Sequence, residues 1–479
     1  MEAQSSHRWT LPTCKARAYL RRLNRSSDEE YRYIPLTPES PTARDAFVTI
    51  PTVRISSETL IYVGLSEARA AELWSRWTNW PDSGPSRETD ADDEGLQVEF
   101  IDFITGTLSN RVNTAEDDDN QWRACLNAYG IAVDVQDAIL DPHFKYLRLS
   151  ESCLFWAKDT IEMRYAGLED IQRASRKREM ELYRAASRPG GDDSEYAADR
   201  HQGRLPLGRG LSMPTGQGQR SVSGLQQQNT SGIEAESWGS VSGIAARNAP
   251  GHVVLFKGID QGRITGLFDE AGALDIGTLL SSAPSDFSGT RSLFYFTLDY
   301  EVAEYYAAFA KRRAECESVV IVCLRIPNTA LESLSAPEIQ RIYWPSSEWK
   351  ELVWRCRTNE PIPLRLRKYR QAVLTIGSIS RKPNYTYRTI RSFEEVTERS
   401  LLEVRRSGRN VPAIQYVFSG QEEGREFLVE HGVRDLKVFP FPQSELEAWL
   451  ASDRWTLFIR FLVRDNKVTG LSALGRWST

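Results

Sequence analysis

Residues 285–313 read SDFSGTRSLFYFTLDYEVAEYYAAFAKRR. A turn of small residues leads into an aromatic run, and aromatic side chains favour a β-strand. A stretch rich in alanine and tyrosine follows at once and favours a helix. Ser292, Tyr295 and Thr297 lie where the turn meets the strand. The corner is therefore either a tightly packed strand–helix junction or one wall of a ligand site.

Strand patterns surround this corner on both sides. HVVLFKGI (residues 252–259) and SVVIVCLRIP (318–327) are continuous apolar runs, which are typical of buried strands. EWKELVW (348–354) and YRQAVLTIGSI (369–379) predict two more strands. Because strands outnumber helices, residues 250–382 are predicted to form an α+β domain.

The chain before this domain divides into three parts. Residues 1–50 are polar and contain several prolines, and they predict a disordered tail. Residues 51–187 predict a helical domain, with one helix capped by Ser66 and a long helix from residue 150 to about 187. Residues 188–249 are rich in Gly, Ser, Gln and Arg, and they predict a disordered linker.

The chain after residue 382 alternates between helix and strand patterns. Residues 392–410 carry a capping-box pattern at Ser392 and Glu395 that predicts a helix, and a second box at Ser444 and Glu447 predicts another. The remaining predicted elements are strands at 411–420, 436–441 and 455–463 and a helix at 422–432. This order favours a small α/β module over residues 383–479. The predicted fold class is thus a multidomain chain: helical, then α+β, then α/β.

Charge, cysteine spacing and the lengths of apolar stretches argue against several classes of protein. The net charge is −5 and the pI about 5.8, so nothing global indicates a nucleic-acid or membrane partner. The six cysteines form no CxxC pair, which makes a metal site unexpected. No apolar stretch is long enough for a signal peptide or a membrane span, so an intracellular protein, cytoplasmic or nuclear, is expected.

One local stretch departs from the acidic average. Residues 355–391 hold ten basic residues and one acidic residue, with tyrosines between them. Arginines interleaved with aromatic rings suit phosphate-bearing or single-stranded nucleic-acid partners. The alternative interpretation, which we favour, is that LRLRKYR places its arginines on the exposed face of an edge strand.

Nucleotide and hydrolase motifs are absent from the sequence: it has no GxGxxG after a strand, no P-loop, no HExxH and no GxSxG. What remains is a constellation in the strand-rich domain. Lys257 and Gly258 end the first strand, Arg291 and Ser292 precede the aromatic strand, and glutamates begin the predicted strand at 348–354. The candidate site residues are Lys257, Gly258, Ser292, Tyr295, Thr297, Tyr305, Glu348 and Glu351.

The arrangement resembles the ADP-ribosyltransferase fold, and most closely a poorly characterised branch of it. The likeness rests on the Asp286-Phe287 turn, the F-Y-F-T strand at 294–297 and the following helix from Ala303 to Ala307. It covers about residues 250–382. The whole chain also resembles multidomain proteins of unassigned function predicted in filamentous fungi.

The resemblance implies NAD as a substrate. Tyr295 and Tyr305 would stack on nicotinamide, and the Lys257 strand would lie along the ribose and phosphates. Glycosidic cleavage develops positive charge on the ribose, so a carboxylate would stabilise it; Glu351 is the first candidate and Glu348 the second. The alternative hypothesis is a non-catalytic interaction or regulatory protein without small-molecule chemistry.

Overall fold

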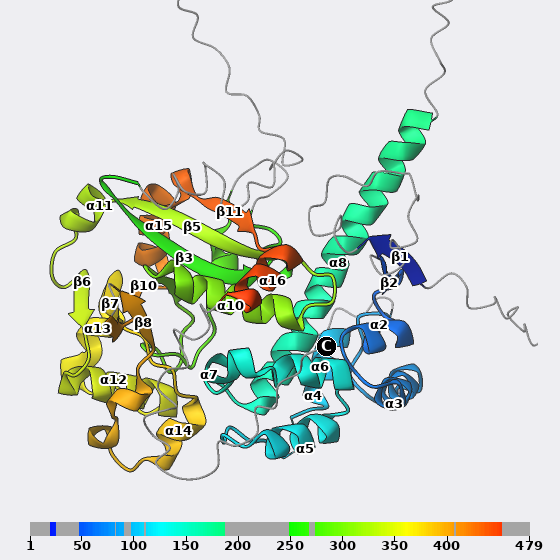
Figure 1. The fold of residues 1–479 in the computed structure, drawn as a ribbon, viewed down its shortest axis with the longest axis horizontal. Coiled ribbons are helices and arrows are strands. Elements are labelled where there is room, and N and C mark those ends of the chain that lie inside the picture. Colours follow the sequence, from blue (N-terminus) through cyan, green and yellow to red (C-terminus); the bar gives the residue numbers. More distant parts are fainter. Residues whose placement is uncertain are drawn as a thin grey trace, which may run out of the picture.

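The computed structural model describes residues 20–24, 47–81, 83–90, 97–109, 112–186, 249–267, 274–406 and 409–452. The described chain has mixed α and β structure: helices dominate up to residue 186, and a seven-stranded sheet dominates from residue 252 onward (Figure 1). The predicted linker and the predicted strand at 455–463 lie outside the described residues, apart from residue 249.

The large sheet has the strand order β11-β5-β3-β4-β10-β7-β6. Every neighbouring pair is antiparallel except β6 and β7, which are parallel. The apolar runs predicted as strands are confirmed as β3 and β5. The strands are β3 (His252–Asp260), β4 (Phe294–Thr297), β5 (Val319–Pro327), β6 (Ile339–Ile342), β7 (Leu374–Ser378), β10 (Ile414–Phe418) and β11 (Lys437–Pro440).

The sheet joins segments that the sequence pattern separates. β10 pairs with both β4 and β7, and β11 pairs with β5 at the edge of the sheet. The expected C-terminal module therefore contributes two strands to the same sheet, and the predicted boundary at residue 382 falls inside it. The physical reason is that β4 and β7 each offer a row of backbone N–H and C=O groups, which β10 satisfies from between them.

The N-terminal part is helical, as predicted. The Ser66 side chain accepts a hydrogen bond from the Arg69 N–H at 3.3 Å and caps α3, and the long predicted helix is confirmed as α8, whose last turns extend beyond the rest of the fold (Figure 1). The helices are α2 (Ser57–Tyr62), α3 (Glu67–Thr78), α4 (Phe100–Gly106), α5 (Asp119–Tyr129), α6 (Val133–Ile139), α7 (Lys145–Arg148) and α8 (Cys153–Ala186).

The predicted tail contains one element of regular structure. β1 (Leu20–Asn24) and β2 (Phe47–Pro51) pair as a two-stranded antiparallel sheet. The expectation of a wholly disordered segment 1–50 is therefore incorrect for these two strands. The apolar residues of FVTIP supply a strand pattern, and Ile50 is buried.

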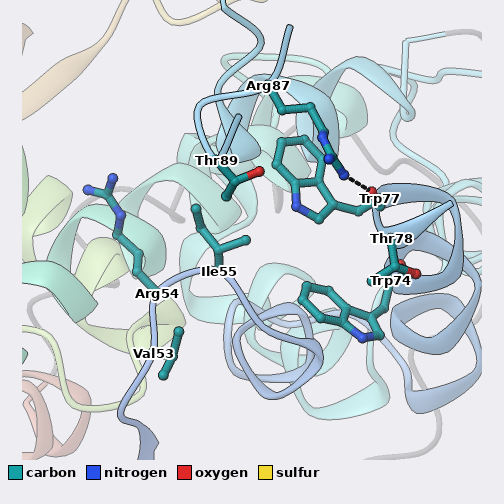
Figure 2. Close-up of a pocket in the computed structure, with 8 residues that line it drawn as sticks. All are labelled: Val53, Arg54, Ile55, Trp74, Trp77, Thr78, Arg87 and Thr89. Atoms are coloured by element: carbon teal, nitrogen blue, oxygen red, sulfur yellow. Dashed lines mark hydrogen bonds between the residues drawn. The ribbon is translucent and has the colours of Figure 1, made fainter. Parts of the chain in front are cut away.

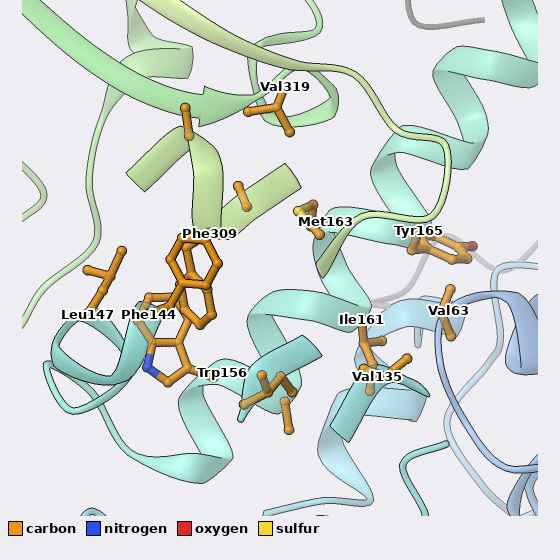
Figure 3. Packing of buried hydrophobic residues seen from close by; sticks show 14 of the residues in the cluster. Val63, Val135, Phe144, Leu147, Trp156, Ile161, Met163, Tyr165, Phe309 and Val319 are labelled. Carbon is orange, nitrogen blue, oxygen red and sulfur yellow. The ribbon is translucent and has the colours of Figure 1, made fainter. Parts of the chain in front are cut away.

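One of the apolar clusters extends from the helical part to the sheet. Phe309 of α10 (Tyr300–Arg313) packs 5.1 Å from the Phe144 ring and 4.9 Å from the Trp156 ring, measured between ring centroids (Figure 3). Phe144 in turn stacks 5.1 Å from Trp449 of α16 (Gln443–Ala451). Three distant segments of the chain thus bury their aromatic rings against one another.

Several predicted elements have a different secondary structure. Residues of EWKELVW form helix α12 (Ser347–Thr358) and not a strand: the Ser346 hydroxyl caps it by accepting from the Trp349 N–H at 3.2 Å, and its buried residues recur at helical spacing. The described residues of 392–410 form short turns and the antiparallel pair of strands β8 (Glu403–Arg406) and β9 (Arg409–Pro412) in place of a helix. There the Ser392 hydroxyl accepts only from the Glu394 N–H, within a single short turn.

Two further predictions, for the LRLRKYR segment and for the cap at Ser444, also differ from the structure. The LRLRKYR segment, expected as an edge strand, is a 3₁₀ turn followed by a short helix, so its arginines do not alternate along a strand. The capping box predicted at Ser444 is also incorrect, because α16 begins after Pro442 without a side-chain cap. The other helices are α11 (Asn328–Ser333), α13 (Arg367–Gln371), α14 (Asn384–Thr389) and α15 (Glu422–His431). No helix among the described residues combines the length and apolarity needed to cross a bilayer.

Candidate functional site

The predicted site residues do not converge on one cleft. Phe256 of β3 lies opposite Thr297 of β4, and successive strand residues point to alternate faces. Tyr295 is therefore on the face of the sheet that carries Phe256, whereas Lys257 is on the other face. The structure does not bring Lys257 and Tyr295 together.

Lys257 fastens a loop to the sheet. Its Nζ donates to the Leu279 carbonyl and to the Ser281 Oγ, both at 2.8 Å. Burial, assisted by the nearby charge of Arg263, lowers the pKa of the Lys257 amine to about 7. An amine held by neutral acceptors in this way positions the 279–281 segment.

Tyr295 and Thr297 have hydrogen bonds within the fold. The Tyr295 hydroxyl is 2.7 Å from the Ser285 Oγ and accepts from the Phe287 N–H at 3.1 Å, so it closes the small-residue turn. Burial raises the pKa of Tyr295 well above its ordinary value. Thr297 donates from its Oγ1 to the Ile414 carbonyl at 3.1 Å and is buried, so it joins β4 to the start of β10.

Gly258 and Tyr305 belong to the packing of α10. A Cβ on Gly258 would lie 2.2 Å from the Ala303 carbonyl oxygen, so only glycine allows α10 to approach β3 this closely. Tyr305 is 1% exposed, and its hydroxyl donates to the His143 carbonyl at 3.3 Å. Tyr305 thus faces the helical part of the chain and lies in a different apolar cluster from Tyr295.

The two candidate glutamates lie on α12 and are paired. Glu351 is 2% exposed, accepts from the Arg355 Nε at 2.9 Å and is also bonded to Arg365. Glu348 accepts from the Tyr369 hydroxyl at 2.5 Å and from the Lys368 Nζ at 3.2 Å. The Tyr369 hydrogen bond, followed by Lys368, holds the pKa of Glu348 below its ordinary value. Both carboxylates stabilise the α12–α13 region.

Among the candidate residues, Ser292 lines a pocket. The pocket has a volume of about 390 Å³ and lies where β4 begins, β10 ends and β7 begins. Residues 287–293, from the turn before the aromatic strand, supply much of one wall. The lining residues are Leu280, Phe287, Ser288, Arg291, Ser292, Leu293, Tyr369, Arg370, Ala372, Thr375, Val417, Ser419, Gly420 and Gln421. We refer to it below as the Arg291 pocket.

Close backbone packing forms the rim of the Arg291 pocket. A Cβ on Gly420 would lie 2.1 Å from the Ser292 carbonyl oxygen, so a glycine is required where the two walls meet. The Gln421 N–H donates to the Ser419 Oγ at 3.1 Å and shapes the turn into α15. Helix α15 begins directly after Gln421, without a side-chain cap, so the positive end of its dipole adjoins the pocket.

The charge of the Arg291 pocket is positive. Arg291 and Arg370 both line it, and no acidic residue is among its lining residues. Within the described part of the chain, neither guanidinium has a protein hydrogen-bond partner; the only bond found at Arg291 is its backbone N–H to the Ser288 Oγ at 2.9 Å. Buried apolar side chains, including Phe287 and Val417, form part of the lining, and serine, threonine and glutamine side chains contribute to the remainder. The pocket therefore combines an apolar floor with two available guanidiniums.

The sequence pattern predicts only part of this pocket. Arg291 and Ser292 stand directly before the aromatic strand, and Arg370 falls within the basic stretch at 355–391. Nothing local connects Arg370 or Gln421 to Ser292, because their proximity depends on β10 lying between β4 and β7. Clusters of three or more possible metal ligands are absent from the described residues.

Comparison of the chain with protein-family models, with curated proteins and with solved structures gives no match. The geometry and charge of the Arg291 pocket are therefore what bears on function.

Proposed function

We propose that the protein binds a small anionic ligand, bearing phosphate or pyrophosphate groups, in the Arg291 pocket. The observation that carries the proposal is the pairing of two unengaged guanidiniums with an apolar floor in one cavity. Guanidinium groups match the geometry of phosphate oxygens and remain charged at any physiological pH. The volume of about 390 Å³ lies within the range of about 300–1,000 Å³ that is usual for small-molecule sites.

The ADP-ribosyl group is the specific ligand that we propose. The resemblance of residues 250–382 to the ADP-ribosyltransferase fold, within a multidomain chain, implies NAD or a related nucleotide. Such ligands carry a pyrophosphate for the guanidiniums and planar rings for the apolar floor. Ser288, Ser292 and Ser419 supply hydroxyl groups that can bond to ribose or phosphate oxygens.

We propose binding in preference to glycosyl transfer. A transferase requires a carboxylate beside the ribose, but Glu351 is paired with Arg355 and Arg365, and Glu348 is bonded to Tyr369 and Lys368. Neither glutamate lines the pocket. A ligand held by cations and hydroxyls alone would be recognised without being cleaved.

Isothermal titration of the full chain with ADP-ribose tests the proposal. Arg291→Gln and Arg370→Gln are each expected to raise the dissociation constant about tenfold or more, since each removes a charge-assisted contact. Arg367→Gln is the matched control, because Arg367 lies on the same short helix as Arg370 but outside the pocket lining. Absence of binding at millimolar ADP-ribose, NAD and pyrophosphate would contradict the proposal and favour the alternative of an interaction protein.

A further inference from the structure

A second pocket lies in the helical part of the chain, far in sequence from the Arg291 pocket. The segment after β2, helix α3 and the loop at 83–90 border this open pocket, and its volume is about 560 Å³. Figure 2 shows its lining residues arranged around an open space, with two tryptophan rings, Trp74 and Trp77, on one side. We call it the tryptophan pocket.

The aromatic wall of the tryptophan pocket is held in place from behind. Trp77 is 2% exposed, and its ring packs 4.9 Å from Phe100 and 5.2 Å from Phe103, between centroids. The Arg87 guanidinium lies over the Trp77 ring at 5.6 Å and donates to the Trp77 carbonyl at 2.6 Å (Figure 2). Trp74 is half-buried and meets Phe100 edge-on. The rings are therefore positioned before any ligand arrives.

Both arginines beside the tryptophan pocket are neutralised by carboxylates. Arg87 pairs with Asp90 at 2.6 Å, while Arg54 pairs with Glu169 at 2.8 Å and lies 3.6 Å from Glu88. An anionic ligand would compete with these carboxylates for the guanidiniums. A cationic ligand would approach a ring face that Arg87 already occupies. The pocket consequently selects against ions of either sign.

We infer that the tryptophan pocket binds a neutral, planar aromatic compound. Ile55 and Val53 provide aliphatic contact, and the half-buried Trp74 ring provides offset or edge-to-face stacking, which favours a ring over an aliphatic chain. The Thr89 hydroxyl has no hydrogen-bond partner among the described residues and can bond to one polar atom on the ring's edge (Figure 2). An indole or a phenol has this chemistry. The site is independent of the Arg291 pocket.

Fluorine NMR of the full chain with fluoroindole as the probe tests this inference. We expect saturable line broadening, at least about tenfold weaker binding for Trp74→Ala, and near-normal binding for Trp74→Phe, which keeps a ring. Tyr385→Ala, which removes an exposed ring on α14, is the control and should leave binding unchanged.

Three outcomes would overturn the inference. They are no saturable binding at millimolar fluoroindole, equal binding by Trp74→Ala, and equally tight binding of a fluorinated alkane or of fluoroindole carboxylate. If circular dichroism shows that Trp74→Ala does not fold, competition on the wild-type chain decides whether the pocket prefers a neutral ring. Unlabelled indole should displace fluoroindole, whereas the alkane and the indole carboxylate should not.

Discussion

At the scale of single residues, Lys257 is expected to give the protein a distinctive pH dependence. Its amine has a pKa of about 7 in the folded chain, against an ordinary value of 10.5, because burial penalises the charged form. Between these values the unfolded chain binds more protons than the folded chain. The free energy of unfolding should therefore rise as the pH increases from 7 towards 10.5.

Urea unfolding at pH 7 and at about pH 8 measures this effect, because both values lie below the ordinary pKa of a cysteine thiol, about 8.5, and far below that of tyrosine. Lys257→Met should remove most of the rise in midpoint, whereas Lys350→Met, on the surface of α12, should keep it. A Lys257→Met variant with the wild-type pH dependence would show that another group is responsible.

At the scale of elements, the contact between α10 and β3 depends on Gly258. A methyl group there would lie 2.2 Å from the Ala303 carbonyl and 2.8 Å from the Ala307 nitrogen, both of which are backbone atoms that cannot rotate away. Gly258→Ala is expected to destabilise the fold by about 2–3 kcal/mol through overpacking. Gly106→Ala at the end of α4 meets nothing within 4 Å and should be neutral or slightly stabilising. Equal denaturation midpoints for the two variants would contradict this account.

Some of the helices and strands could be predicted from sequence patterns and others could not. Runs such as VVIVCLRIP predict strands because nearly all their residues are apolar, and β5 buries these side chains on both faces of the sheet, apart from the half-buried Arg325 and Pro327. WKELVW was misassigned because its apolar spacing fits a short strand as well as a helix, and the Ser346 cap is a stronger indicator than the apolar run. Strand pairing could not be predicted, because β10 inserts between two strands that are distant in sequence.

At the scale of the whole molecule, one apolar cluster contains residues of both the helical part and the sheet. Phe309 contacts Phe144 and Trp156 together, and Arg357 of α12 pairs with Asp286 at 2.7 Å and with Glu151 at 3.0 Å. Residues far apart in the chain are thus buried by one another. We expect the first half of α8 and strands β3 and β5 to unfold in one cooperative step.

Hydrogen exchange followed by mass spectrometry in increasing urea checks this expectation. Amides of the first half of α8 and of β3 should report the same free energy of opening. Phe309→Ala should lower both by similar amounts, about 3–5 kcal/mol. Exchange of the α8 amides at lower urea than the β3 amides would instead identify independent domains.

The candidate site was only partly predictable, because it depends on strands that are distant in sequence and pair in the sheet. Arg291 and Ser292 could be found because they precede an unusual aromatic strand. Lys257, Tyr295 and Glu351 have the residue types of a nucleotide site, but their side chains are directed to different partners within the fold. The pocket requires β10 between β4 and β7 and the turn at 419–421, which no local pattern encodes.

A crystal structure of the full chain with ADP-ribose is the most direct test of the central claim. We predict that the pyrophosphate lies in the Arg291 pocket, with its oxygens about 3 Å from the guanidiniums of both Arg291 and Arg370. Density for the ligand at any other place on the protein, or an empty pocket at saturating ligand, would contradict the account.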